Sequence, residues 1–154
     1  IFPEPEVLLT ETQKLPRLDG RKMSKSYGNA VFLSAPAEEI DRKLSRMMTD
    51  PARVKRTDPG EPEKCPAFQL PKIYCTPEEI EFVSAGCRTA GIGCLECKKV
   101  MIKHVIEDLA PFREKRAQLE KTPDVVEEVL QAGHEAAQKK ASETMSEVRE
   151  TLGL

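Results

Sequence analysis

The most regular hydrophobic pattern in the chain lies in its C-terminal segment. Apolar and small residues recur there at intervals of three or four, close to the 3.6-residue period of an α-helix. Thr122 followed by Pro123 is typical of a helix start. We therefore expect a helix from Pro123 to Thr151 with one stripe that can approach a neighbouring helix closely. The stripe consists of Val126, Leu130, Gly133, Ala137, Ala141, Met145, Val148 and Leu152.

Four earlier segments also favour helix. Ile40, Leu44 and Met47 share one helical face. Proline cannot donate the backbone hydrogen bond of a helix interior, so Pro111 is expected to interrupt the last of these helices at Ala110. The first expected helix begins near Ser34–Pro36 and ends at Asp50–Pro51, and the second runs from about Pro66 to Tyr74. The third runs from Thr76–Pro77 towards Gly86, and the fourth from Leu95 to Ala110.

The N-terminal part of the chain has a different character. Three prolines between Ile1 and Pro16 predict an extended lead-in, in which Val7 to Leu9 could form a short strand. Ala30 to Leu33 is a second brief β-prone run. The fold class expected from the pattern is therefore mainly α, a helical bundle preceded by a loop and a short strand segment.

Composition agrees with a helical, surface-rich protein. The chain has 154 residues, of which 39% are hydrophobic and 32% charged, with no tryptophan. It begins at Ile1 and not at methionine, so we expect a fragment or a processed product. No apolar run approaches the ~18 residues of a membrane span, and no secretory signal is visible. The expectation is a cytoplasmic protein without a membrane partner.

Charge is unevenly distributed, although the net charge is only −2. Residues 41–56 contain six basic and two acidic residues, whereas residues 124–150 contain seven acidic and three basic residues. An RNA partner would meet the first region before the second. Ordinary solvated helix faces explain the acidic tail equally well.

The stretch from Gly20 to Asn29 lacks apolar periodicity and is rich in cations and hydroxyls. Three cations and two hydroxyls fall between Arg21 and Ser26, and Gly20 and Gly28 flank them. Lysines, hydroxyls and free backbone N–H groups are what a polyphosphate requires around it. We interpret the stretch as a phosphate-binding loop, with a solvated basic turn as the alternative.

Five cysteines point to metal chemistry. Cys94 and Cys97 form a C-x-x-C pair, and Cys87 and Cys65 bring the possible thiolate ligands to four. Four thiolates suit either tetrahedral Zn²⁺ or a [4Fe–4S] cluster. Cys75 falls outside this set and is interpreted as a buried or spare thiol. Reduced structural cysteines and a redox sensor at Cys87, Cys94 and Cys97 are the alternatives.

Three stretches together resemble a known family. They are LDGRKMSKSYGN (Leu18 to Asn29), MMTDPARVKRTDPGEPEKCP (Met47 to Pro66) and CRTAGIGCLECKK (Cys87 to Lys99). In this order they resemble the C-terminal half of bacterial-type tryptophanyl-tRNA synthetases, which are class I aminoacyl-tRNA synthetases; the tyrosine enzymes share only the first stretch. The resemblance implies the end of a catalytic Rossmann domain with the KMSKS loop at 1–36, and a helical tRNA anticodon-binding domain at 37–154.

The resemblance also implies an activity, the ATP-dependent activation of tryptophan and its transfer to tRNA(Trp). Lys22 and Lys25 would be the catalytic cations. ATP, with Mg²⁺, would be bound by Lys22, Met23, Ser24, Lys25 and Ser26. The family's His-Ile-Gly-His signature and tryptophan pocket lie in an N-terminal half that this sequence does not contain; His104 and His134 match nothing catalytic. The fragment alone is expected to be inactive, and the full-length protein to be a homodimer.

Some members of the family carry a [4Fe–4S] cluster on a C-x₂₂-C-x₆-C-x₂-C pattern. This chain matches the second and third spacings and is one residue short in the first. The resemblance thus implies Cys65, Cys87, Cys94 and Cys97 as cluster ligands, with Zn²⁺ as the alternative. The cluster would turn nearby cations towards the anticodon, namely Arg88, Lys98 and Lys99. The competing hypothesis is a standalone metal-stapled RNA-binding module without catalytic activity.

Overall fold

A computed structural model describes residues 2–10, 12, 15, 18–19 and 25–154. These residues are mainly helical, and no strand occurs among them. The chain divides into two compact units, Thr10–Glu114 on the one hand and Ile1–Leu9 with Lys115–Leu154 on the other. Among the described helices, none combines the length and apolar character required to span a bilayer.

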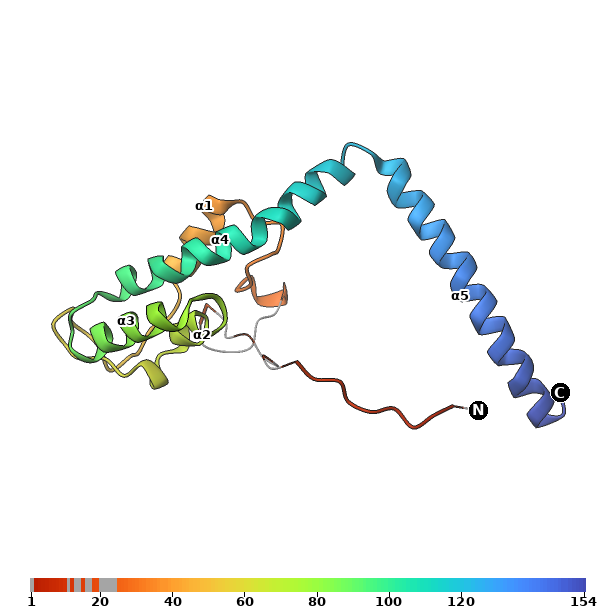
Figure 1. The fold of residues 1–154 in the computed structure, drawn as a ribbon, viewed down its shortest axis with the longest axis horizontal. Helices are drawn as coiled ribbons and strands as arrows, with labels where there is room; N and C mark the ends of the chain where they lie inside the picture. The colour runs from red at the N-terminus through yellow and green to blue at the C-terminus, as the bar shows by residue number, and fades with distance from the viewer. Residues whose placement is uncertain (1, 11, 13–14, 16–17, 20–24) are drawn as a thin grey trace. The chain divides into compact units, whose positions relative to one another are not determined.

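The larger unit contains every element up to and including most of α4 (Figure 1). Its long helices are α3 and α4, and the segments between α1 and α3 are single turns. The elements are the 3₁₀ turn η1 (Lys25–Tyr27), α1 (Ala37–Ser45), η2 (Pro62–Lys64), η3 (Pro66–Gln69), α2 (Pro71–Tyr74), α3 (Pro77–Arg88) and α4 (Cys94–Leu119).

The main hydrophobic core of this unit lies between α1 and α4. Ile40 and Leu44 project from α1, spaced one helical turn apart as the sequence pattern predicts, and both are fully buried. They belong to one cluster with α4, which contributes Met101, Ile102, Val105 and Leu109. A smaller cluster of Phe68, Val83 and Ile92 packs beside the cysteines.

Helix α3 begins as the sequence predicts. The Thr76 hydroxyl accepts a hydrogen bond from the Glu79 backbone N–H at 3.3 Å, and the Glu79 carboxylate accepts one from the Thr76 N–H at 3.0 Å. This reciprocal pair is a capping box, which satisfies two N–H groups that the first helical turn leaves free. The box therefore fixes both the start of α3 and the position of the Glu79 carboxylate.

The expectation that Pro111 ends the preceding helix is wrong. Helix α4 continues through Pro111 to Leu119. The Arg113 guanidinium folds back past the proline and donates to the Ile106 carbonyl at 3.0 Å. The carbonyl that loses its helical donor to Pro111 is that of Glu107, four residues earlier, so the Arg113 bond to Ile106 is an addition one residue away from that gap.

The strand expected at Ala30 to Leu33 is also absent from the structure. These residues form an irregular segment that ends in a turn, in which Ala35 N–H donates to the Phe32 carbonyl at 3.0 Å. Val7 to Leu9 is likewise not a strand. Strands require a hydrogen-bonded neighbour, and no partner strand is present among the described residues.

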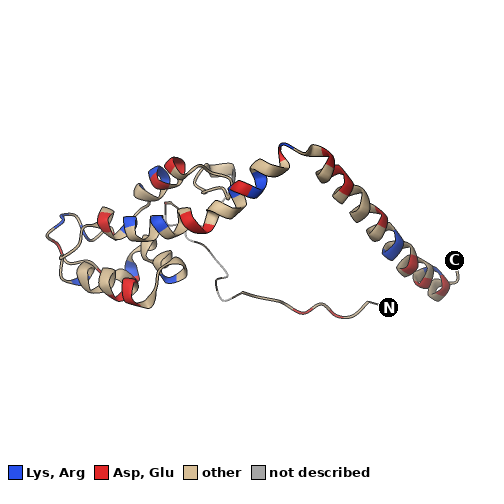
Figure 2. Cartoon of the chain, turned by 45° about the horizontal axis from the view of Figure 1, so that its top comes forward, with Lys and Arg blue, Asp and Glu red and all other residues tan. Residues whose placement is uncertain are grey.

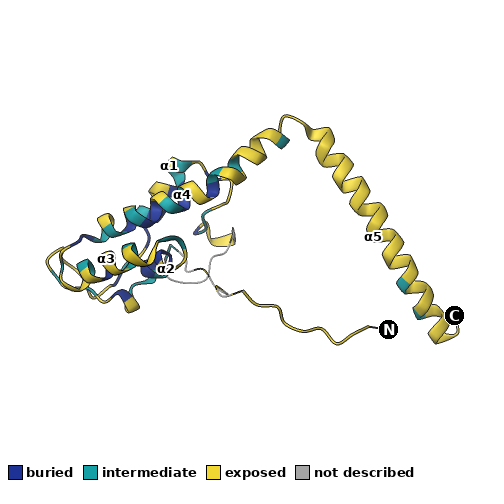
Figure 3. Cartoon of the chain, in the orientation of Figure 1, coloured by how far each residue is buried: buried dark blue, intermediate teal, exposed yellow. Residues whose placement is uncertain are grey.

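Helix α5 (Pro123–Leu152) confirms the C-terminal helix predicted from the sequence. Gly153 follows it in the left-handed conformation, with φ of 71°, as expected of a helix C-terminus. Helix α5 buries no residue (Figure 3). Acidic and basic side chains both occur along the helix (Figure 2).

Candidate metal centre and basic loop

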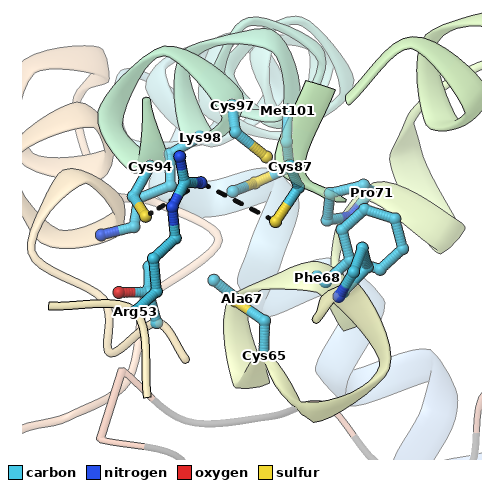
Figure 4. Close-up of a pocket in the computed structure, with 12 residues that line it drawn as sticks. Arg53, Cys65, Ala67, Phe68, Pro71, Cys87, Cys94, Cys97, Lys98 and Met101 are labelled. Carbon is cyan, nitrogen blue, oxygen red and sulfur yellow. Dashed lines mark hydrogen bonds between the residues drawn. The ribbon is translucent and has the colours of Figure 1, made fainter. Parts of the chain in front are cut away.

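The four predicted metal ligands meet at one small cavity. Cys65, Cys87, Cys94 and Cys97 all line it, together with apolar side chains that include Phe68 (Figure 4). The cavity has a volume of about 20 Å³, close to the space of one water molecule. Residues that are up to 32 positions apart in the sequence are therefore brought together by the fold.

Three separate elements deliver the sulfurs. Cys65 is the residue between η2 and η3, and Cys87 is in the last turn of α3. Cys94 opens α4, and Cys97 follows three residues later on the same face of that helix. The C-x-x-C spacing thus has a direct structural meaning, because it places both sulfurs on the side of α4 that faces the cavity.

Arg53 joins two of the thiols. Its Nη1 lies 3.8 Å from the Cys87 sulfur and 3.7 Å from the Cys94 sulfur (Figure 4). Its Nη2 donates to the Ile92 carbonyl at 2.7 Å and to the Arg56 carbonyl at 3.0 Å. The residue is buried, and its Nε has no hydrogen-bond partner. Arg53 belongs to the basic 41–56 stretch, yet its charge is directed towards sulfur.

Burial shapes the protonation of the thiols. It raises the pKa of the Cys97 thiol to about 12, and the neighbouring cysteines add to this effect. Burial also raises the pKa of Cys87, whereas the charge of Arg53 acts in the opposite direction. In the absence of a metal, these two sulfurs are therefore held as neutral thiols at neutral pH.

The structure gives Lys98 a different position from the one expected of an RNA contact. Its side chain is buried, and Nζ donates to the backbone carbonyls of Ser45 at 2.8 Å and Met47 at 2.5 Å. These carbonyls lie at the C-terminal end of α1, where a cation is favoured. Burial lowers the pKa of Lys98, and the nearby Cys94 opposes this shift most strongly. Lys98 therefore ties α1 to α4.

The other two predicted RNA contacts are exposed. Arg88 pairs with Glu63 and also donates to the Ser84 hydroxyl. Lys99 lies on the exposed side of α4, one residue after Lys98. Arg88 follows Cys87 in α3 and Lys99 lies two residues after Cys97 in α4, but neither side chain lines the cysteine cavity.

The described ends of the basic loop are fixed to each other and to α1. Asn29 donates to the Asp19 carboxylate at 3.2 Å, which brings the two sides of the loop together. Lys43 of α1 donates to the Ala30 carbonyl at 2.9 Å. The Met48 N–H donates to the Leu18 carbonyl at 2.7 Å.

Part of the predicted ATP site lies outside the described residues, namely Lys22, Met23 and Ser24. Lys25 opens the 3₁₀ turn η1, and Ser26 in this turn is exposed. Gly28 follows with φ of 64°, a conformation in which residues with a Cβ are strained. The glycine at the C-terminal side of the loop is therefore a backbone requirement.

Sequence reasoning missed two features of this region. The first is the contact of Arg53 with two cysteines, which no short-range sequence pattern predicts. The second is the pairing of Glu79 with His104, whose Nε2 lies 2.8 Å from Glu79 Oε2. The Thr76-x-x-Glu79 capping signature was visible in the sequence, but its partner 25 residues further along was not.

Comparison with known proteins defines the class first. The family model described as tRNA synthetases class I (W and Y) matches residues 1–110. The match covers more than half of the chain, and the chain belongs to this family.

The relatives within the family are tryptophan–tRNA ligases. The chain is 48% identical to that of Aquifex aeolicus over its whole length, covering 39% of the relative, and 44% identical to that of Thermotoga maritima, covering 47%. The crystal structure of tryptophanyl-tRNA synthetase from Campylobacter jejuni complexed with ADP and tryptophan superimposes with a TM-score of 0.76 at 27% identity. This superposition covers 92% of the chain and 44% of that structure.

These matches confirm the resemblance noted from the sequence, including its position in only part of a longer protein. The chain spans less than half the length of the curated relatives it matches most extensively. Membership of the iron–sulfur subgroup stays a prediction.

Proposed function

We propose that this chain is the C-terminal portion of a tryptophan–tRNA ligase. The observation that carries the proposal is the 48% identity to the Aquifex aeolicus enzyme along the full chain. In the full-length protein the activity is the ATP-dependent formation of tryptophanyl-adenylate, followed by transfer of tryptophan to tRNA(Trp). In this family, most of the dimer interface, the tryptophan pocket and most of the adenosine contacts lie in the N-terminal half of the enzyme.

The basic loop supplies charge to the first chemical step. Negative charge grows on the departing pyrophosphate, and fixed cations lower such a barrier. Lys22 and Lys25 provide these cations, Ser24 and Ser26 donate hydrogen bonds, and ATP carries Mg²⁺. The Asn29–Asp19 contact and the Lys43 bond to Ala30 support this role, because they anchor the base of the loop and leave its tip to act on the nucleotide.

The four cysteines supply the donor set of a [4Fe–4S] cluster, and the cavity of about 20 Å³ between them would have to widen to hold it. Four sulfurs from three elements surround one cavity, and a buried guanidinium lies beside two of them, suited to an anionic thiolate centre. A zinc ion would draw its four sulfurs to about 3.8 Å from one another, given Zn–S bonds of about 2.3 Å. In the described part of the chain, a group of three ligand atoms within 4.8 Å of one another occurs at a different place. No three of these four sulfurs form such a group. The wider spacing favours the cluster, which would be held by Cys65, Cys87, Cys94 and Cys97.

The tRNA contact is assigned to the cations beside this centre. Single-stranded anticodon bases are accessible to side chains, and phosphates attract exposed cations. Arg88 and Lys99 are exposed and close in the sequence to Cys87 and Cys97, so we retain both as anticodon contacts. Lys98 supports them from the interior. Residues 37–154 are accordingly proposed as the tRNA-binding part of the enzyme, and residues 1–36 as the end of the catalytic domain.

The test is tryptophan-dependent ATP–pyrophosphate exchange by the full-length protein. Lys25→Ala should slow exchange by roughly 10²-fold or more, as loss of a transition-state donor does. Lys140→Ala is the matched control, because this lysine is exposed on α5 far along the chain from the loop. An exchange rate unchanged by Lys25→Ala, or exchange that does not depend on tryptophan, contradicts the assignment.

The alternative, a standalone RNA-binding module, is tested by the same protein. The hypothesis predicts that the natural gene product lacks exchange activity yet binds tRNA(Trp) through the 37–154 region. Binding is compared between tRNA(Trp) and a version with a swapped anticodon, in the presence of the four-cysteine metal centre. Exchange activity in the natural gene product excludes the alternative.

A further inference from the structure

A second group of metal-ligating side chains lies outside the cysteine cavity. It consists of Cys75, Glu79 and His104, whose ligand atoms are all within 4.8 Å of one another. None of the three lines the four-cysteine cavity. Cys75 is the one cysteine that the cluster pattern does not use.

Three elements converge to form this group. Cys75 directly follows α2, Glu79 is in the first turn of α3, and His104 is in the middle of α4. All three residues are half-buried. The site therefore lies within the larger unit, where the short helix α2 meets α3 and α4.

Two of the three ligands are already oriented. Glu79 Oε2 accepts the Thr76 N–H at 3.0 Å in the capping box, which fixes the carboxylate. The same carboxylate lies 2.8 to 2.9 Å from His104 Nε2, which fixes the imidazole. On the far side of the ring, Glu107 Oε2 lies 4.0 Å from Nδ1. This distance exceeds a hydrogen bond, and the Glu107 carboxylate would have to approach by about 1 Å to become the outer partner of a metal-bound histidine.

The donor set selects a borderline-soft cation. Thiolate, imidazole and carboxylate are the three ligand types that proteins use for Zn²⁺. With a neutral imidazole, one thiolate and one carboxylate balance the charge of a divalent ion, which suits a half-buried position. A tetrahedral ion with bonds of about 2.0–2.3 Å places its ligand atoms roughly 3.3–3.8 Å apart, within the observed limit.

We propose that Cys75, Glu79 and His104 form a Zn²⁺ site that is distinct from the four-cysteine centre. Three protein ligands leave the fourth position to water, as in open zinc sites. Binding forms the Zn–S bond and breaks the S–H bond of Cys75, and the proton leaves to solvent. The metal would join the α2–α3 junction to α4.

The neighbourhood of Cys75 agrees with this exchange of a proton for a metal. Burial, and secondarily Glu79, raise the pKa of the Cys75 thiol to about 11. The thiol is consequently protonated and poorly reactive until a cation replaces its proton. One proton released for each ion bound is an expected accompaniment.

The experiment is an anaerobic titration of the whole chain with Co²⁺, followed by competition with Zn²⁺. Cys94→Ser combined with Cys97→Ser disables the four-cysteine centre, so any remaining tight binding reports on the second site. We expect this double variant to bind one equivalent of Co²⁺ with a thiolate-to-cobalt absorption band. Adding Cys75→Ser should abolish the band, and adding His104→Ala should weaken binding at least 10-fold.

His134→Ala is the matched control, because His134 is exposed on α5. Helix content measured by circular dichroism identifies variants that fail to fold, and Glu79→Gln provides a further ligand variant that keeps side-chain size. The absence of a thiolate–cobalt band from the folded double variant overturns the proposal. Binding in the folded His104→Ala protein at the level of the control overturns it as well. Neither result bears on exchange activity, so the outcome is independent of the proposed function.

Discussion

The guanidinium of Arg53 lies 3.7 Å from the sulfur of Cys94, although the two residues are 41 positions apart. The same group holds the Ile92 carbonyl at 2.7 Å. A buried cation therefore takes part in two tasks. It donates to a turn that precedes α4, and it faces the sulfurs that are proposed to hold the cluster.

Replacing Arg53 by methionine should weaken both tasks. The carbonyls of Ile92 and Arg56 lose their donor, which costs roughly 1–3 kcal/mol of unfolding free energy. Retention of iron should fall by about 10- to 100-fold, as when an outer-shell partner is lost. Denaturant unfolding and metal analysis of the anaerobic protein measure the two effects. Arg56→Met is the control, since the Arg56 side chain makes an exposed pair with Glu96 at 3.3 Å and the substitution leaves the Arg56 carbonyl in place. A control that behaves like Arg53→Met contradicts the assignment.

The adjacent residues Lys98 and Lys99 should respond in opposite ways. Lys98→Met leaves the Ser45 and Met47 carbonyls without a charged donor, and should lower stability by roughly 1.5–3 kcal/mol. Lys99→Met should change stability by less than about 0.5 kcal/mol. It should nevertheless weaken tRNA binding and reduce its dependence on salt. Equal stability of the two variants would show that Lys98 is not the internal tie described above.

Two glycines provide a matched pair of Gly→Ala changes. A Cβ on Gly60 would lie 2.6 Å from the Cys87 sulfur and 3.0 Å from Arg53 Cδ, so Cys87 must move. We expect a loss of about 1–3 kcal/mol in stability, together with poorer metal retention. A Cβ on Gly133 in α5 meets nothing within 4 Å, and Gly133→Ala should stabilise the helix by about 0.5–1 kcal/mol. Thermal unfolding and iron content of the two variants check this contrast.

The Glu39–Lys43 pair should contribute to stability at neutral pH and lose its effect in acid. The hydrogen bond from Lys43, at 2.7 Å, holds the pKa of Glu39 below its ordinary value of 4.5. A carboxyl whose pKa is lower in the folded state stabilises the protein above the unfolded pKa. Its contribution then disappears as pH falls through the folded pKa, so the window lies below about 4.5.

Glu39→Gln should therefore make the melting temperature depend less on pH at the acid end of the range, without altering the fold. Melting temperatures recorded between about pH 3 and 7 test this expectation. Lys43→Met serves as the comparison, because it removes the same pair and also the bond to the Ala30 carbonyl. An acid limb that is identical in the wild type and in Glu39→Gln would exclude the pair as its source.

Long periodic patterns and capping signals were sufficient to predict most helices. The repeat along 123–151 predicted α5, and Thr76 followed by Pro77 and Glu79 predicted the start of α3. Such signals act within one or two turns, where the sequence spacing itself sets the geometry. The helix expected from Leu95 begins one residue earlier, at Cys94, and this places the Cys94 and Cys97 sulfurs on one helical face.

Features that depend on distant residues could not be predicted in this way. Helix α4 continues through Pro111, which local propensity does not predict. Lys98 and Lys99 are chemically alike, and only the position of the α1 carbonyls determines which of them is internal. The contact between Arg53 and Cys94 likewise depends on how the 50–60 segment folds back towards α4.

The single peptide group that joins Met47 to Met48 connects the basic loop to the helix that carries Cys97. The Met48 N–H holds the Leu18 carbonyl at the entrance of the basic loop, and the Met47 carbonyl is held by Lys98, the neighbour of Cys97. A displacement of either partner therefore acts on the same short piece of backbone. Substitutions at the loop base and at the cysteine centre should consequently be thermodynamically coupled, so that their combined effect departs from the sum of the separate effects.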